Sequence, residues 1–351
     1  MYRSLIIVAA VLASAAPARA EPEVLDVDPA QDWVHAPTGV RLPARLNDLA
    51  RDRITSFLAG ENNIGTSYFS PDDSEILSIY VYRSGSYDVS MMADAAIAAM
   101  STNDQLGSIA ADSAIFATFG DAAIGQASGI AATFSVVGDY RSTGLALFRT
   151  GNWLVKIRLS SKRTDAETLD RRLRMLAAGL PVDPPGRTAP PAYRITECER
   201  FSPRGEVARR KLAMTDWIIA TTVVSLSYEE TAEDEVEGAI APQDTPRLCR
   251  DRQSRPGRMF YRDAESGDPR TIVFGDAGTV SQVGETAISL EEATSPPVVL
   301  SIGNGMRTEF YAGFESTPGF AQMIRTLEDG GVQASVARTD DGSEITLNTT
   351  E

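Results

Sequence analysis

Histidine, the commonest general base in enzymes, is the scarcest chemically active side chain here. Among 351 residues there is one, His35, which stands close to Trp33 and Pro37. A Ser-His-Asp hydrolase or a Cys-His protease would need this imidazole as its base, and a zinc site with two or three histidines cannot form within the chain. Residues 125–129 place Ser128 one position too late for the G-x-S-x-G motif. We expect His35 to be a packed or surface side chain, and we predict no catalytic residue.

Lysines that could act as nucleophiles or bind phosphate are also scarce. The chain has three lysines, Lys156, Lys162 and Lys211, and none of them stands three residues after a serine, as the S-x-x-K motif requires. No lysine follows a glycine-rich turn, so a phosphate-cradling P-loop is also missing. We therefore predict no cofactor.

Carboxylates are abundant, and they leave two alternatives open. The acidic run at residues 229–237 could supply oxygen ligands for calcium, although the chain has no D-x-[DN]-x-[DN]-G pattern. Two carboxylates ~5–9 Å apart in a cleft between domains could instead hydrolyse a substrate. The alternatives to a non-enzymatic protein are thus a calcium-stabilised structural module and a periplasmic acidic-dyad hydrolase. Nothing selects a particular pair, so we predict no metal ligand.

The charge balance and the first residues limit the partners and the location of the protein. The formal net charge is −15, so nucleic acid and anionic membrane surfaces would repel the chain. A short basic start, an apolar segment at residues 5–16 and Ala18-Arg19-Ala20 predict a signal peptide over residues 1–20, cleaved after Ala20. The apolar segment is shorter than the ~20 residues that span a bilayer. We expect a periplasmic or secreted protein without a stable membrane anchor.

The two cysteines, Cys198 and Cys249, are expected to form a disulfide, because an even pair in an oxidising compartment usually does so. They are far apart in the sequence and no Cys-x-x-Cys is present, which argues against a redox-active pair. The bond would add roughly 4 kcal/mol to stability by the chain-entropy relation.

Residues 129–181 carry the clearest pattern of secondary structure. Strands at 145–149 and 153–159 flank Thr150-Gly151-Asn152 and predict a hairpin. Thr164 and Glu167 have the spacing of a capping box, and four leucines at helical spacing predict a closing helix. The stripe consists of Leu169, Leu173, Leu176 and Leu180.

Earlier residues predict the rest of this first domain. Residues 68–69 and 76–83 read as a second hairpin, and 115–119 and 130–137 as further strands. Asp88 is expected to cap a helix over 89–100.

The second half has a weaker pattern. Residues 207–214 are expected to be helical, and the β-branched apolar run at 217–226 predicts a buried strand. Short strands are expected at 271–274, 278–283, 298–302 and 308–313, followed by a helix with the stripe Phe320, Met323, Ile324 and Leu327. A final hairpin is expected around Asp340-Asp341-Gly342.

Three tyrosines offer the one candidate recognition surface. Tyr80 and Tyr82 face the side of their strand opposite to Leu77, Ile79 and Val81, and Tyr87 follows nearby. Exposed tyrosines favour recognition, although packing beneath the helix at 89–100 is the competing interpretation. A protein partner or a small ligand is the kind of partner that this surface would serve.

Residues 33–181 resemble a Mog1/PsbP-type α/β/α sandwich. The resemblance lies in the opening segment WVHAPTGVRL, the tyrosine-rich strand at 76–83, the helix at 89–100 and the block at 148–180. It is also similar to secreted bacterial proteins of unknown function with the pattern vyvYr … lfr.g.w.vkir. The resemblance implies an antiparallel sheet flanked by helices and a non-catalytic binding or assembly role, and it transfers no site residue.

Together these observations predict an α+β protein with two domains. A flexible leader at 21–32 is followed by the α+β sandwich domain at 33–181 and a proline-rich linker at 182–191. A smaller, disulfide-stapled, β-rich α+β domain at 192–351 completes the chain. We expect a non-enzymatic binding or assembly module.

Overall fold

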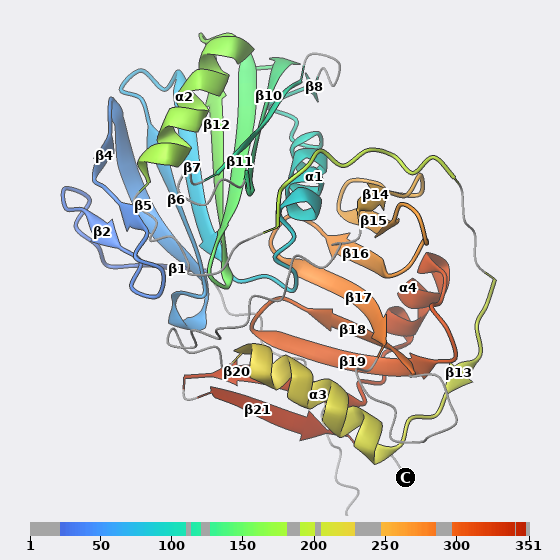
Figure 1. Cartoon of the computed structure of the whole chain (residues 1–351). Helices are drawn as coiled ribbons and strands as arrows, with labels where there is room; N and C mark the ends of the chain where they lie inside the picture. The colour runs from blue at the N-terminus through green and yellow to red at the C-terminus, as the bar shows by residue number, and fades with distance from the viewer. Residues whose placement is uncertain are drawn as a thin grey trace, which may run out of the picture.

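The computed structural model describes residues 22–109, 114–120, 127–180, 190–200, 205–228, 247–285, 297–340 and 342–348. These residues form two large antiparallel sheets and four α-helices, a mixed α+β architecture (Figure 1). The predicted signal peptide, most of the predicted linker and the acidic run at 229–237 lie outside the described residues. Among the described helices, none combines the length and the apolar character that crossing a membrane needs.

The first sheet is built from the first half of the chain. Its strands follow the order β1-β5-β6-β7-β12-β11-β10-β8, with β4 pairing with β5 and β9 with β10. The strands are β1 (Glu23–Val24), β4 (Arg45–Leu46), β5 (Leu49–Leu58), β6 (Asn63–Phe69), β7 (Glu75–Tyr82), β8 (Ser108–Ile109), β9 (Ile115–Phe119), β10 (Gly129–Val137), β11 (Ser142–Thr150) and β12 (Trp153–Ser161). Both predicted hairpins, β6–β7 and β11–β12, are confirmed.

The two faces of this sheet are covered differently. Helix α2 (Ala166–Gly179) packs its leucine stripe on one face, together with Trp153, Val155, Ile157 and Leu159. Helix α1 (Val89–Met100) packs on the opposite face. The alternation of strand side chains therefore puts Tyr80 and Tyr82 on the α1 side and Leu77, Ile79 and Val81 on the α2 side. Figure 1 shows α2 and α1 on either side of the sheet.

The predicted N-cap is confirmed for α1 and wrong for α2. Asp88 caps α1 as predicted, because its carboxylate accepts a hydrogen bond from the Met91 amide at 2.8 Å. In α2 the cap is Asp165, which accepts from the Thr168 amide at 2.8 Å. The predicted Thr164 capping box is thus wrong. The Thr164 hydroxyl donates to the Glu75 carboxylate at 3.1 Å instead, and an aspartate one position later supplies an equally good cap acceptor.

The segment before β5 is ordered against the sheet. β1 pairs with β5 within the stretch expected to be a flexible leader, and Leu25 and Val27 pack against the core. β2 (Trp33–Val34) and β3 (Arg41–Leu42) form a separate two-stranded ladder. A short 3-10 turn, η1 (Ala59–Glu61), joins β5 to β6.

The second sheet comes from the second half of the chain. Its order is β14-β15-β16-β17-β18-β19-β20-β21, and β13 pairs with β19. The strands are β13 (Arg209–Arg210), β14 (Leu248–Arg250), β15 (Arg258–Asp263), β16 (Arg270–Phe274), β17 (Thr279–Glu285), β18 (Val298–Gly303), β19 (Arg307–Phe314), β20 (Ala334–Thr339) and β21 (Gly342–Leu347). The four predicted short strands correspond to β16–β19, and the predicted final hairpin is β20–β21.

Helix α4 (Phe320–Asp329) is confirmed, with its apolar stripe on the β15–β19 sheet and Gly330 at its end with φ of 72°.

Two other predictions in this half are wrong. Residues 207–213 hold the short strand β13 and are not helical, and the run at 217–226 lies inside helix α3 (Met214–Tyr228). The run shows neither the alternation of a half-buried strand nor a one-sided helical stripe. Its pattern therefore cannot distinguish a buried strand from a helix.

The two halves share one apolar core at their junction. Buried side chains of α1 and the first sheet pack directly against Met259, Tyr261, Val273 and Val280 of the second sheet. Asp94 of α1 bonds to Arg250 at 2.7 Å and to the Tyr261 hydroxyl at 3.0 Å. Helix α1 is therefore sandwiched between both sheets, and α4 covers the far face of the second sheet (Figure 1).

The predicted disulfide between Cys198 and Cys249 is confirmed. It ties the segment at 190–200 to β14, next to backbone hydrogen bonds from Cys198 to Arg250 and from Arg250 to Thr196. Ile195 of this segment is buried in the shared core. The bond thus fixes the start of the second half against the junction.

Candidate functional site

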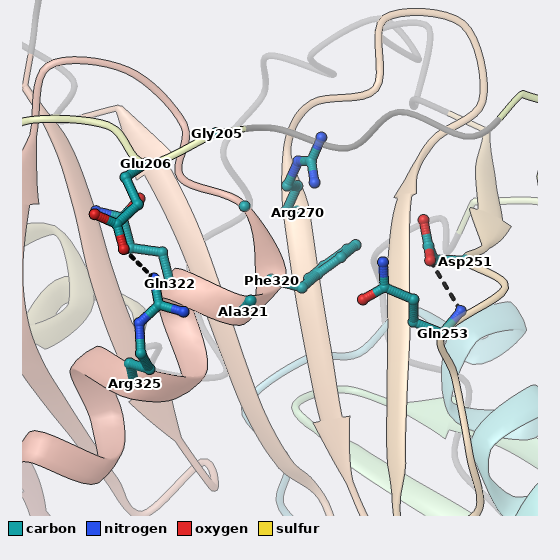
Figure 2. Close-up of a pocket in the computed structure, with 10 residues that line it drawn as sticks. Gly205, Glu206, Asp251, Gln253, Arg270, Phe320, Ala321, Gln322 and Arg325 are labelled. Atoms are coloured by element: carbon teal, nitrogen blue, oxygen red, sulfur yellow. Dashed lines mark hydrogen bonds and ion pairs between the residues drawn. The ribbon is translucent and has the colours of Figure 1, made fainter.

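A cavity of about 320 Å³ opens beside the first turn of α4. Four parts of the chain line it, and the first three are Gly205–Glu206 before β13, Asp251 and Gln253 after β14, and Arg270 at the start of β16. Residues 319–322 and Arg325 of α4 complete the lining. In Figure 2, Arg270 and Phe320 lie in the middle, Gln322, Glu206 and Arg325 on one side, and Asp251 and Gln253 on the other.

Arg270 and Phe320 of the cavity lining contact each other, and Phe320 also contacts the Phe260 ring. The Arg270 guanidinium carbon lies 5.1 Å from the Phe320 ring centroid, and Phe320 lies 4.8 Å from the Phe260 ring. The Arg270 side chain is 2% exposed, and its Nε lies 3.5 Å from the Asp268 carboxylate. A buried guanidinium therefore lines the cavity beside Phe320.

The rim carries a weaker ion pair. Arg325 contacts the Glu206 carboxylate at 2.5 Å, with side chains 52% and 79% exposed. Such a surface pair contributes only about 0–1 kcal/mol, so an incoming carboxylate can replace Glu206 at little cost. Gln322 is locked by two hydrogen bonds to the Val207 backbone, at 2.8 and 2.9 Å.

The start of α4 adds to the positive potential. Gly319 is the N-cap residue and offers no side-chain acceptor to the first helical amides. The first amides of a helix have no intrahelical partner, although the Gln322 amide here already donates to the Gly319 carbonyl at 3.0 Å. The helix dipole makes this end partly positive. Together with Arg270 and Arg325, this end favours a carboxylate in the cavity.

The wall of the cavity opposite α4 carries one carboxylate that is paired with an arginine and one polar side chain. The Asp251 carboxylate lies 3.6 Å from the Arg262 guanidinium, and both side chains are 4% exposed. Gln253 is exposed and presents its side-chain amide to the same cavity. The arrangement can hold a small acid by its carboxylate on the α4 side and by a hydroxyl or amide group on the Gln253 side.

The single histidine is distant from this cavity and is packed. His35 is fully buried, with its ring 4.7 Å from Trp153 and 5.9 Å from Trp33. Nε2 lies 3.0 Å from the Glu61 carbonyl and Nδ1 lies 2.7 Å from the Thr38 hydroxyl. Since a carbonyl only accepts, Nε2 carries the proton and Nδ1 accepts from Thr38. Burial lowers the pKa of His35, which favours the neutral ring.

The structure separates the three tyrosines of the candidate recognition surface. Tyr80 and Tyr82 contact the Lys156 ammonium, which lies 4.9 Å and 5.4 Å from their rings. Tyr82 is 2% exposed and joins the core under α1. Lys156 pairs with the Asp276 carboxylate at 2.8 Å, so these two tyrosines line a packed junction between the halves.

Tyr87 lies in a different environment. It is half-buried, and the Arg149 guanidinium carbon lies 5.1 Å from its ring. Burial raises the pKa of Tyr87, and the neighbouring charges of Arg83, Arg338 and Arg149 oppose that rise. Tyr80 and Tyr82 thus lie beside a lysine, whereas Tyr87 lies beside an arginine.

No group of three or more histidine, cysteine, aspartate or glutamate side chains is arranged to hold a metal ion in the described part of the chain. The acidic run suggested for calcium lies outside that part. The calcium-stabilised module and the acidic-dyad hydrolase therefore stay predictions from the sequence.

Sequence reasoning does not find the cavity. The helical pattern places Phe320 in the apolar stripe of its helix, but Arg270, Arg325 and Gln253 belong to no motif. They come together only because β14, β16 and α4 meet in space. Pro318-Gly319 before an amphipathic helix is the one local signal of an uncapped helix start.

The chain was compared with protein-family models, curated proteins and solved structures, and it matches none of them. The fold defines a mixed α+β protein with two antiparallel sheets that share one helix layer. The resemblance of residues 33–181 to a Mog1/PsbP-type sandwich stays a prediction.

Proposed function

We propose that the protein is an exported, non-enzymatic binding protein and that the cavity beside α4 is its ligand site. The observation that supports the proposal best is the convergence of Arg270, Arg325 and the uncapped start of α4 on one cavity. The ligand class that fits is a small polar carboxylate, such as a hydroxy acid. Its carboxylate would meet Arg325 and the α4 amides, and its hydroxyl would meet Gln253.

The location proposed is the periplasm or the extracellular space. The Cys198–Cys249 disulfide supports this location, because structural disulfides persist in oxidising compartments.

The test is a titration of the mature protein with L-lactate, followed by ligand-observed NMR. Lactamide has the same shape without the charge and serves as the neutral control. We expect saturable binding of lactate and none of lactamide. Arg325→Gln should weaken lactate binding at least about tenfold, since it removes a charged hydrogen-bond donor worth about 1.5–3 kcal/mol.

The matched control variant is Arg307→Gln. Arg307 is also half-exposed and also paired with a carboxylate, Glu309 at 2.9 Å, but it lies on β19 away from the cavity lining. It should bind lactate like the wild type. Equal binding of lactate and lactamide, or equal loss in both arginine variants, would contradict the proposed site.

A further inference from the structure

Two carboxylates line the cavity beside α4, and they differ in their freedom to move. The Asp251 carboxylate is buried beside Arg262 and accepts a hydrogen bond from the Gln253 amide at 3.0 Å. The Glu206 side chain is 79% exposed and contacts the Arg325 guanidinium at 2.5 Å (Figure 2). Moving Asp251 would leave the buried Arg262 guanidinium without this carboxylate, whereas Glu206 can turn into water. Glu206 is therefore the carboxylate that an incoming acid displaces.

The backbone beside Glu206 is fastened to α4. The Val207 amide donates to the Gln322 side-chain oxygen at 2.9 Å, and the Gln322 side-chain amide donates back to the Val207 carbonyl at 2.8 Å. Gln322 and Arg325 are three residues apart in α4, so they lie on the same side of the helix. This clamp between Val207 and Gln322 holds Glu206 next to Arg325. A carboxylate tethered in this way competes with free acids at an effective concentration that its tether sets.

The charges of the cavity lining are balanced while Glu206 is in place. The lining carries two guanidinium groups, from Arg270 and Arg325, and two carboxylates, from Glu206 and Asp251. A singly charged acid that binds Arg325 brings one carboxylate and releases another at the exposed rim. A doubly charged acid brings a second carboxylate, and the described residues of the lining include no third cation to receive it.

We infer that Glu206 is an internal competitor for the carboxylate position on Arg325, and that it makes the cavity select singly charged acids over doubly charged ones. This role rests on the proposed function, because it concerns the same cavity and the same arginine. Binding exchanges one ion pair for another: the Glu206 carboxylate leaves Arg325 for solvent, and the carboxylate of the ligand takes its place. The clamp keeps the displaced Glu206 at the rim, where it repels a second carboxylate on the ligand.

The test compares L-lactate with L-malate, which has the same 2-hydroxy acid group and one more carboxylate. Both acids are titrated into the mature wild type and into Glu206→Gln at constant ionic strength, and binding is followed by ligand-observed NMR. Glu206→Gln should bind lactate about two- to fivefold more tightly, because the surface ion pair that lactate replaces is worth up to about 1 kcal/mol. Malate should gain up to about a further fivefold, since like charges about 4 Å apart repel by about 1 kcal/mol even in water.

The matched control variant is Glu328→Gln. Glu328 is on the same helix, its side chain is 63% exposed, and its carboxylate lies 3.7 Å from Arg258, but it does not line the cavity. The substitution removes the same charge from the protein, and it should leave the binding of lactate and of malate unchanged. Equal gains in both glutamine variants would mean that net charge alone sets the affinity, which would overturn the role of Glu206.

The remaining outcomes separate this role from the proposed function. Lactate binding that is unchanged in Glu206→Gln but weakened in Arg325→Gln would overturn the competition and leave the carboxylate site intact. An equal gain for lactate and malate would overturn the selection of singly charged acids. Absence of lactate binding in both the wild type and Glu206→Gln would contradict the carboxylate site itself, and with it the role of Glu206.

Discussion

Burial decides the role of the most reactive side chains in this protein. His35 lies between two tryptophans with both ring nitrogens engaged. Lys156 lies under Tyr80 and Tyr82 and pairs with Asp276. Neither residue lines the α4 cavity. Both side chains instead help to hold strands and halves together.

His35 should make the protein less stable as the pH falls below about 6.5. Its pKa is lowered in the fold, mainly by burial, so the unfolded chain takes up a proton first, at about pH 6.5. The stabilisation from neutral His35 is therefore complete above that pH and is lost as the pH falls toward the folded pKa. Urea unfolding at several pH values should show the free-energy difference between wild type and His35→Gln shrinking, by at most about 1.4 kcal/mol per pH unit. Parallel curves would contradict this role of the imidazole.

At the scale of elements, α3 is the least expected part of the fold. Its buried side carries Thr221, Ser225 and Tyr228, whereas Ile218 and Leu226 are 47% and 61% exposed. The Tyr228 hydroxyl bonds to Thr308 at 2.8 Å, and Trp217, Ala220 and Val224 pack toward β20 and its neighbours. The helix is therefore positioned by a mixed polar and apolar stripe.

A pair of variants distinguishes this helix from the strand expected at 217–226. A strand would put Val224 and Leu226 on the same face, so their replacement by lysine would have similar effects. In the helix, Leu226→Lys should change stability by less than about 0.5 kcal/mol, whereas Val224→Lys should cost about 1–3 kcal/mol, because it puts a charge at a half-buried position that packs against the core. Chemical denaturation of both variants measures the difference, and equal losses would argue for the strand.

Local signals account for what the sequence predicts well. Asp88 and an apolar stripe are enough for α1, and a glycine with φ of 50° between two alternating strands is enough for β11–β12. Around Val223, apolar side chains point in every direction and Thr221 and Ser225 lie on the buried side, so the sequence does not say which side is buried. The cavity escapes sequence reasoning because Arg270 and Phe320 are 50 residues apart and meet only through tertiary packing. Local chemistry predicts elements, and long-range packing builds the site.

At the scale of the whole molecule, the packed junction between the two halves of the chain determines how the protein unfolds. One apolar cluster contains α1, strands of the first sheet and strands of the second. The buried Lys156 ammonium donates to both the carboxylate and the carbonyl of Asp276, each at 2.8 Å. Burial on its own would raise the pKa of Asp276, but the Lys156 ammonium lowers it overall. The halves should therefore unfold together.

Lys156→Met should destabilise the protein by about 3–5 kcal/mol, because it leaves the Asp276 carboxylate partly buried without its cation. The double variant Lys156→Met with Asp276→Leu should recover much of that loss, since a matched apolar pair avoids the uncompensated charge. Circular dichroism and tryptophan fluorescence should report the same single transition in the wild type, because Trp153 and Trp217 lie in different halves. Two separate transitions would contradict a shared core.

The proposed binding function is tested most directly by mapping L-lactate onto the protein with amide NMR spectra. We expect saturable shifts at the start of α4, in residues 319–322, with much smaller effects in Arg325→Gln and none with lactamide. Shifts that do not saturate, or that fall elsewhere in the chain, would contradict the claim that this cavity is a carboxylate-binding site.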